Sequence, residues 1–230
     1  MKRLVIAGAL ALVAGGYAVA ADLPYPRPVP QAPVAYLPVV PAYSWTGFYI
    51  GINGGGGFGN SNWLDPVLGN SGNFNTSGFL IGGTVGANYQ IGQFVLGIEG
   101  DGDWQNLDGT TTGGSCVGQG CETKSNWLAT VRGRAGYAWD RVLFYGTGGV
   151  AFANVQAGAG ALPFSSSTQT GWTAGAGVEY AFAPNWTAKV EYLYVDLGSF
   201  NCGLNCGNGL VTDNVSLHTN ILRAGVNYRF

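Results

Sequence analysis

Charge is scarce in this sequence. Acidic and basic residues make up 10% of the 230 residues, against about 25% in a typical soluble domain, and the net charge is −2. The chain has no block of basic residues, so nothing indicates nucleic acid as a partner. A soluble protein this poor in charge would lack solvating surface. The chain is therefore either an unusually apolar soluble β protein or a membrane protein made of strands.

Long apolar runs are also missing beyond the amino terminus, although hydrophobic residues reach 47% of the chain. No later stretch approaches the ~20 apolar residues of a membrane-spanning helix. Residues 1–20 combine Lys2 and Arg3, a short apolar run and an A-x-A site that ends at Ala20. This plan is typical of a secretory signal peptide, and it favours cleavage after Ala20 over a retained membrane helix.

The segment that follows is rich in proline. Residues 21–43 hold seven of the ten prolines, which keep a segment extended without a core of its own. We expect a linker here, and a proline-motif ligand is the alternative. From residue 44 to 230, apolar and polar residues alternate repeatedly and no helical period holds, which predicts one all-β domain.

The pattern predicts eight strands, at about 45–58, 77–91, 93–104, 126–139, 141–154, 169–183, 185–198 and 215–230. Tight connections near Gly92, Asp140 and Pro184 alternate with long ones rich in Gly, Asn, Ser and Thr. The long connections are predicted at 59–76, 105–125, 155–168 and 199–214. This alternation predicts an eight-stranded antiparallel transmembrane β-barrel with short periplasmic turns and long external loops. The linker would then be periplasmic.

One face of the predicted strands suits lipid. Trp127 and Trp139 bracket small and apolar residues, and on a tilted strand they lie roughly 30 Å apart along the membrane normal. That span matches the hydrocarbon core of a bilayer, with an aromatic side chain at each interface. Other strands repeat the pattern, which predicts an aromatic girdle of Phe79, Tyr89, Phe94, Trp104, Trp127, Trp139, Trp172 and Phe182. A soluble barrel with these rings inside is disfavoured, because eight strands enclose only a narrow interior.

The opposite face carries charges, five acidic and six basic. We expect these lumen residues to be Glu99, Asp101, Asp103, Arg132, Arg134, Arg141, Glu179, Lys189, Glu191, Arg223 and Arg229. The tight turn at Pro184 sets Glu179 opposite Lys189. Across the long loops, Glu99 would face Arg132, and Glu191 would face Arg223. Because unpaired charges in a narrow interior are costly, we expect an ion-paired plug, and the alternative is the lining of a water-filled pore.

Four stretches carry a family resemblance: "SWTGFYIGINGG" (44–55), "FVLGIEGDGDW" (94–104), "RGRAGYAWDRVLFYGTGGVAF" (132–152) and "LRAGVNYRF" (222–230). As an ordered set they resemble the small outer-membrane β-barrel family, the opacity-like, porin-type surface antigens of Gram-negative bacteria, over essentially all of 44–230. The resemblance implies location in the outer membrane and insertion by the barrel-assembly machinery. It also implies that the terminal aromatics, Tyr228 and Phe230, are part of the insertion signal. It brings no catalytic residue, cofactor or metal ligand.

The cysteines form two close pairs, Cys116 with Cys121 and Cys202 with Cys206. After export the surroundings are oxidising, and an even count favours disulfides. Pairing within each segment is the simplest of three connectivities. A four-cysteine zinc site is the alternative, but the spacings are loose for it.

The single histidine raises an enzyme hypothesis. His218 lies two residues from Ser216 on a predicted strand, so both would point outward near its external end. Some small outer-membrane barrels are lipid A hydrolases that use Ser, His and an acid. We expect no carboxylate to orient His218, and an interfacial histidine is the simpler interpretation. The "GTGGVA" stretch (146–151) lies mid-strand with no helix after it, so no dinucleotide cofactor is expected.

Three functions remain after these exclusions. We expect a structural surface protein that supports membrane integrity and presents its loops outside. A low-conductance porin for small solutes is the alternative, followed by a lipid A-modifying enzyme. The expected partners are outer-membrane lipid and lipopolysaccharide, the barrel-assembly machinery, and an external ligand or host surface that contacts the loops.

Overall fold

A computed structural model describes the part of the chain that forms the barrel. The described residues are 43–65, 69–70, 74–112, 120–159, 165–201 and 214–230. The predicted signal peptide (1–20) and all of the predicted linker (21–43) except Tyr43 lie outside them, so both stay predictions. No helix among the described residues is long and apolar enough to cross a membrane.

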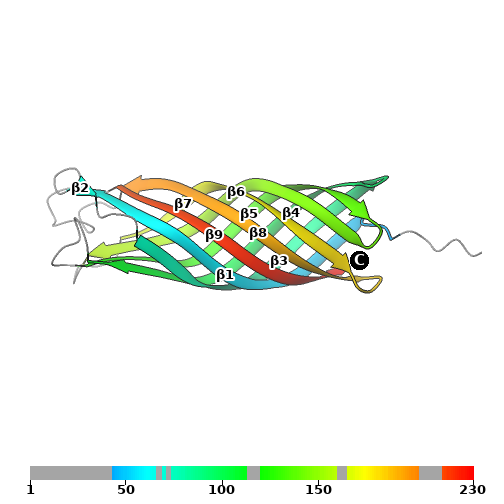
Figure 1. The fold of residues 1–230 in the computed structure, drawn as a ribbon, viewed down its shortest axis with the longest axis horizontal. Coiled ribbons are helices and arrows are strands. Elements are labelled where there is room, and N and C mark those ends of the chain that lie inside the picture. The colour runs from blue at the N-terminus through cyan, green and yellow to red at the C-terminus, as the bar shows by residue number, and fades with distance from the viewer. Residues whose placement is uncertain (1–42, 66–68, 71–73, 113–119, 160–164, 202–213) are drawn as a thin grey trace, which may run out of the picture. The chain divides into compact units, whose positions relative to one another are not determined.

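The described chain consists almost entirely of antiparallel strands (Figure 1). Eight of them are long and one, β2, has two residues. Their bounds are β1 Gly47–Asp65, β2 Gly69–Asn70, β3 Phe74–Ile91, β4 Phe94–Thr111, β5 Cys121–Trp139, β6 Val142–Ala159, β7 Ser165–Ala181, β8 Trp186–Asn201 and β9 Asn214–Arg229. Each long strand pairs with its neighbours in sequence, and β2 pairs only with the end of β1.

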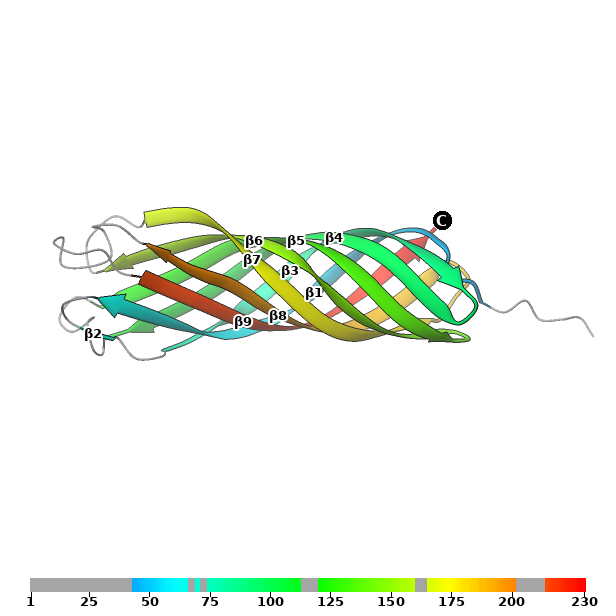
Figure 2. The same cartoon turned by 90° about the horizontal axis from the view of Figure 1, so that it is seen from above.

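The sheet closes on itself because β1 also pairs with β9. Their register runs from Tyr49 opposite Arg229 to Leu64 opposite Asn214. In Figures 1 and 2 the strands wind obliquely around a closed barrel, with the tight turns and the carboxyl terminus at one end. The predicted eight-stranded antiparallel barrel is therefore confirmed.

The three tight turns lie where the sequence predicts them, between β3 and β4, β5 and β6, and β7 and β8. Gly92 and Asp140 have positive φ angles of 62° and 51°, which two-residue hairpin turns require. At the opposite, external side the predicted ends are wrong for β1, β4, β5 and β6, which continue five to seven residues further, whereas those of β3, β7, β8 and β9 agree within four residues. Inward and outward positions keep alternating there, although both the inward and the outward side chains are largely polar.

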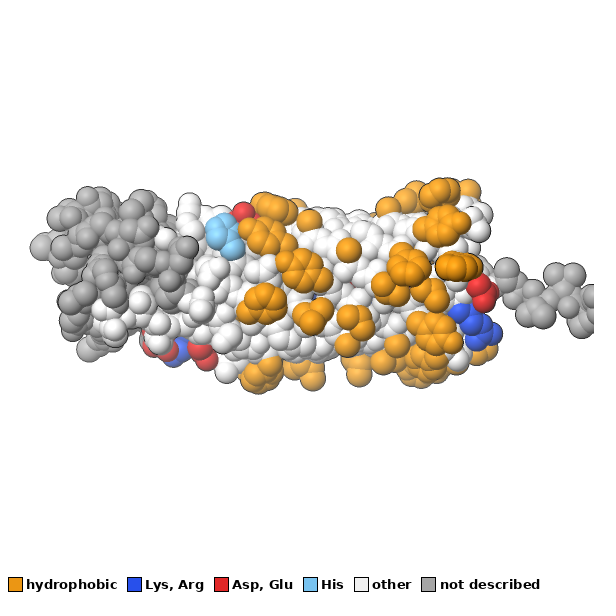
Figure 3. Space-filling model, in the orientation of Figure 1, with side chains coloured by type: hydrophobic (Ala, Val, Ile, Leu, Met, Phe, Trp, Pro, Cys, Tyr) orange, Lys and Arg blue, Asp and Glu red, His pale blue; other side chains and the backbone are white. Residues whose placement is uncertain are grey.

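The outward face between the two ends of the barrel is apolar. All eight predicted girdle residues are among the exposed large hydrophobic side chains, with Trp127 38% and Trp139 73% exposed. Neighbouring rings contact each other edge to face, as in Phe79 with Trp104 and Phe94 with Tyr137. Figure 3 shows apolar side chains spread over the middle of the barrel. Such a band between aromatic interfaces matches a bilayer.

The outward face of the barrel becomes polar beyond the aromatic girdle residues nearest the external end, which we call the external girdle. The outward side chains there are polar, and we call this zone the collar (Figure 3). Its described members are Asn60, Asn62, Asn75, Ser77, Asn106, Asp108, Thr110, Glu122, Lys124, Asn126, Asn154, Gln156, Ser166, Thr168, Thr170, Asp196, Ser216, His218 and Asn220. The barrel therefore extends past the apolar band on its external side.

A charge placed in the apolar band tests the orientation of the wall. Val131→Arg puts a guanidinium in the middle of the band, where a basic residue costs about 2–4 kcal/mol of folding free energy. Thr110→Arg places the same group in the collar, where we expect about 0–1 kcal/mol. Urea unfolding of the protein in lipid vesicles measures both. Equal costs would contradict the assignment of this band to lipid.

Candidate functional site

The interior of the barrel holds a cluster of buried charges. Of the eleven residues expected in the lumen, the structure buries ten: Glu99, Asp101, Asp103, Arg132, Arg134, Glu179, Lys189, Glu191, Arg223 and Arg229. The placement of Arg141 was wrong. Arg141 is exposed in the two-residue turn between β5 and β6, where the alternation of the strands does not continue.

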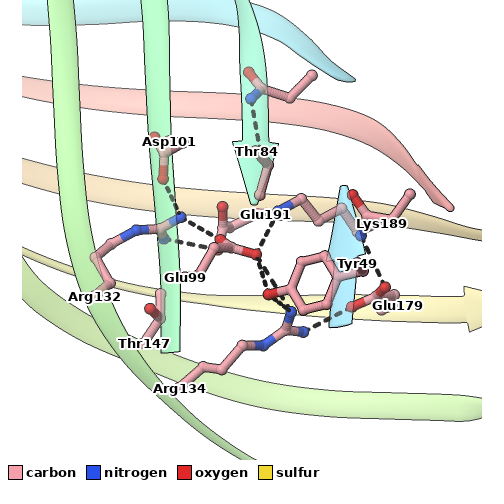
Figure 4. Close-up of polar contacts among 12 residues, drawn as sticks. Tyr49, Thr84, Glu99, Asp101, Arg132, Arg134, Thr147, Glu179, Lys189 and Glu191 are labelled. Atoms are coloured by element: carbon pink, nitrogen blue, oxygen red, sulfur yellow. Dashed lines mark hydrogen bonds and ion pairs between the residues drawn. The ribbon is translucent and has the colours of Figure 1, made fainter. Parts of the chain in front are cut away.

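Glu99 on β4 is the hub of this cluster (Figure 4). Its carboxylate lies 2.5 Å from an Arg132 nitrogen, 3.3 Å from Arg134 and 2.9 Å from Lys189. The Tyr49 hydroxyl donates a hydrogen bond of 2.8 Å to the same carboxylate. Four different strands therefore meet at one side chain, and nearly all of it is removed from solvent.

A second set of contacts links Arg132 and Arg223 through shared carboxylates. Arg132 donates to Glu191 at 2.9 Å and to Asp101 at 2.8 Å. Arg223 donates from Nε to Glu191 at 2.9 Å, and from Nη1 to Asp101 at 2.8 Å and Asp103 at 2.9 Å. With the contact of Arg132 to Glu99, each arginine thus binds three carboxylates, two of which, Glu191 and Asp101, are shared. The planar guanidinium group, with its five N–H donors, is suited to such contacts.

Register and ion pairing differ in an informative way. The strands place Glu179 opposite Lys189, Glu99 opposite Arg132, and Glu191 opposite Arg223. Glu179 nevertheless makes its ion pair with Arg134, at 2.7 Å, and Lys189 makes its own with Glu99. Glu99 with Arg132 and Glu191 with Arg223 are both opposite in register and ion-paired. Long side chains also reach across a narrow barrel, so register identifies some of the partners and not all of them.

Inward glycines make the room that the cluster needs. A Cβ on Gly86 would lie 2.3 Å from the Tyr49 hydroxyl, and one on Gly177 would lie 2.6 Å from the Tyr145 ring. The Arg134 guanidinium stacks on the Tyr145 ring, 3.9 Å from its centroid. Large rings and guanidinium groups therefore occupy space that side chains at these glycines would take.

Apolar side chains fill the interior on both sides of the charges, a feature that the sequence analysis missed. The layer toward the external end consists of Leu80, Leu128, Ala151, Ala153, Val155, Leu193, Val195, Leu197, Leu217 and Ile221. The layer toward the tight turns consists of Trp45, Val95, Ala138, Leu143, Tyr145 and Ala181. A cavity of about 10 Å³ among Leu107, Leu197 and Leu217 has room for about one water molecule.

Trp45 is the largest side chain in the apolar layer toward the tight turns. It is fully buried, its indole N–H donates to the Asp140 carbonyl at 3.1 Å, and its backbone N–H donates to the Gln90 side chain at 2.7 Å. Arg229 holds the same segment by donating to the carbonyls of Ser44 at 2.6 Å and Thr46 at 3.0 Å, and to the Tyr43 hydroxyl. The residues that precede β1 thus close one mouth of the barrel.

The remaining predicted positions fall in three groups. Tyr228 and Phe230, expected in the insertion signal, are outward, and their rings contact each other edge to face. Cys116, Cys202 and Cys206 lie outside the described residues, and of Cys121 only the backbone is described. The disulfides therefore stay predictions. No cluster of metal-binding side chains occurs among the residues that the structure places.

The surroundings of His218 correct one expectation. We expected no carboxylate beside it, but Asp196 on β8 lies 3.4 Å from its Nδ1, because the two residues are paired across β8 and β9. The Tyr194 hydroxyl is also 3.4 Å from Nδ1, and the two rings stack. Within the described strands, no hydrogen bond joins Ser216 to His218. Both residues lie within predicted strands, and the predicted register that sets Glu191 opposite Arg223 also sets Asp196 opposite His218, so cross-strand pairing would have predicted this carboxylate.

Removing the charge of Glu99 tests whether the cluster depends on its hub. Glu99→Gln leaves Arg132, Arg134 and Lys189 short of one carboxylate in a buried site, and we expect a loss of about 3–5 kcal/mol in unfolding free energy. Glu122→Gln is the matched control. It breaks a half-exposed pair with Lys124 and should cost less than about 1 kcal/mol.

Both variants are compared by urea unfolding in lipid vesicles. A Glu99→Gln protein as stable as the Glu122→Gln control would show that the interior charges do not depend on one another.

Comparison with known proteins identifies the family. Residues 8–230 match the family described as "Outer membrane protein beta-barrel domain". A 31 kDa outer-membrane immunogenic protein of Brucella melitensis is 39% identical over 250 residues, which cover 100% of both chains. A 25 kDa outer-membrane immunogenic protein of Brucella abortus is 33% identical over 230 residues, covering 100% of this chain and 99% of the relative. A 22 kDa outer membrane protein of Rhizobium leguminosarum is 39% identical over 177 residues, covering 74% and 73%.

One solved structure supports the fold. The outer membrane protease OmpT of Escherichia coli aligns with a TM-score of 0.50 at 9% identity, covering 84% of this chain and 99% of that one. Neisserial surface protein A aligns with a TM-score of 0.40 at 20% identity, covering 80% and 98%. At 9% identity the likeness to OmpT concerns the barrel alone. The match over residues 8–230 and the similarity to the Brucella proteins show that this chain belongs to the outer membrane protein β-barrel family and is an outer-membrane protein.

Proposed function

We propose that the protein is a closed, non-conducting wall element of the outer membrane that displays its external loops at the cell surface. The observation that carries this proposal is the filled interior. Three fillings follow one another along the lumen from the tight turns: the apolar layer that includes Trp45, the ionic cluster, and the apolar layer that includes Leu193. A solute would have to displace all three.

The ionic cluster supports a structural role in preference to a pore lining. The side chains of Arg132, Glu191 and Arg223 have 0% of their surface exposed to solvent. A pore lining needs charges that water and solutes can reach. Charges that pair with one another hold the strands together across the lumen, and each carboxylate that is paired in this way is occupied by an arginine or lysine of the protein itself.

The loops are the part of this protein that we propose to act outside the cell. Relatives named as outer-membrane immunogenic proteins support surface exposure of this kind. Disulfides within the segments of Cys116 and Cys121, and of Cys202 and Cys206, would stiffen two of the loops and reduce the entropy lost on binding. The binding partner would be an external ligand or a host surface.

Assembly would follow the route of the family. We propose that Tyr228 and Phe230 contribute to recognition by the barrel-assembly machinery, and the outward position of both rings at the end of β9 supports this. β9 is also the strand that closes the barrel against β1. Recognition at β9 would therefore act on the strand whose pairing with β1 closes the barrel.

Single-channel recording tests the closed state. We expect purified protein in planar phosphatidylcholine bilayers to give no openings. Trp45→Ala should stay silent as well, because the ionic and external layers remain, and folding of each sample is checked by its heat-modifiable gel mobility. Stepwise currents from the native protein that rise with salt concentration would support the porin instead.

Lipid A analysis tests the proposed absence of catalysis at His218. Cells that make the native protein and cells that make His218→Ala should yield lipid A of identical mass, because Ser216 makes no hydrogen bond to His218 in the described strands. Mass spectrometry of extracted lipid A measures this. Loss of an acyl chain with the native protein, but not with His218→Ala, would establish a hydrolase.

A further inference from the structure

The collar lies at the height of the lipid headgroups of the outer leaflet. On β4, Trp104 belongs to the external girdle, and Asn106, Asp108 and Thr110 follow on the same face. Successive outward residues of a tilted strand rise about 5 Å along the barrel axis, so these three reach about 15 Å above the girdle. The collar therefore meets whatever lies directly above the acyl chains.

Hydroxyl and amide groups dominate this surface. On β7 the collar consists of Ser166, Thr168 and Thr170, all exposed. Some members bond to their neighbours, as Asn154 does to Ser166 at 3.0 Å, and this holds them in place across the strands. Such groups both donate and accept hydrogen bonds, which matches the hydroxyls of a sugar.

The charges of the collar do not favour phosphate. Lys124 is the one Lys or Arg among the described collar residues, and it pairs with Glu122 at 2.6 Å. That hydrogen bond raises the pKa of the Lys124 ammonium, and Asp108 on the neighbouring strand adds to the rise. Asp196 supplies a further carboxylate, so the described collar is net negative. The one Lys or Arg among these described residues is already paired with a carboxylate, which disfavours binding of an anionic group.

We propose that the collar is a docking surface for the sugar headgroups of the outer-leaflet glycolipid, which it binds through hydroxyl and amide side chains and not through the lipid's phosphates. Height, hydrogen-bonding capacity and charge point to the same occupant. The chemistry differs from a basic clamp, which binds phosphate through arginine and lysine. The proposal holds whether or not the barrel conducts.

The test compares lipid headgroups that differ in phosphate alone. The native protein is placed in phosphatidylcholine nanodiscs without additive, with bisphosphorylated lipid A, or with dephosphorylated lipid A. Its unfolding temperature is read from the heat-modifiable gel shift. We expect both glycolipids to raise the unfolding temperature by about 3 °C or more, since a ligand that binds only the folded state stabilises it. Dephosphorylation should not reduce the gain.

Two variants distinguish the recognition chemistries. Thr168→Val with Thr170→Val removes two collar hydroxyls and keeps β-branched side chains suited to a strand, so it should fold in plain nanodiscs and lose at least half of the glycolipid gain. Lys124→Gln is the matched control and should keep the gain. The proposal fails if dephosphorylated lipid A does not stabilise the native protein, if the threonine variant keeps the full gain, or if Lys124→Gln abolishes it.

Discussion

Unpaired backbone groups in hydrocarbon cost several kcal/mol each, and the whole fold follows from avoiding that cost. An open sheet would expose two edges to lipid, so β1 and β9 must pair along their length, as they do from Tyr49 opposite Arg229 to Leu64 opposite Asn214. The pairing leaves no free edge in the apolar band. The closed sheet has eight long strands, and the number of strands sets the width of the interior.

The narrow interior of the barrel limits which side chains fit inside it. Glycines such as Gly86 and Gly177 face inward where a Cβ would collide with a tyrosine ring or its hydroxyl, and the space goes to Tyr49, Tyr145 and Arg134. At this width long side chains reach the opposite wall, so Glu99 collects partners from β1, β5 and β8. Filling of the lumen is thus a consequence of closure, and the closed state follows from the same geometry.

Alternation along the sequence predicted most of the fold, because a strand between lipid and lumen must alternate. It placed the girdle aromatics outward and ten lumen charges inward. The alternation pattern gave wrong predictions where the inward and outward side chains of a strand have similar polarity. Above the girdle both faces are largely polar, so the external ends of β1, β4, β5 and β6 were placed too early. Asp196 beside His218 was missed for another reason, because the register between β8 and β9 was not followed beyond Glu191 and Arg223. Inside the barrel, Leu193 and Val195 were overlooked because their outward neighbours Tyr192 and Tyr194 are apolar as well. Ion-pair partners on strands that are not adjacent leave no pattern in a single sequence from which they could be predicted.

The ionic layer is better understood as a source of register than of stability. Buried ion pairs gain little over well-packed apolar residues, because desolvation offsets their attraction. An entirely apolar lumen, however, would resemble the outer face, and a strand shifted by one residue would exchange two similar surfaces. With charges inside, such a shift in β5 would move Arg132 and Arg134 into lipid, at about 2–4 kcal/mol each near the midplane. Charges confined to inward positions therefore make the wrong register expensive on the strands that carry them.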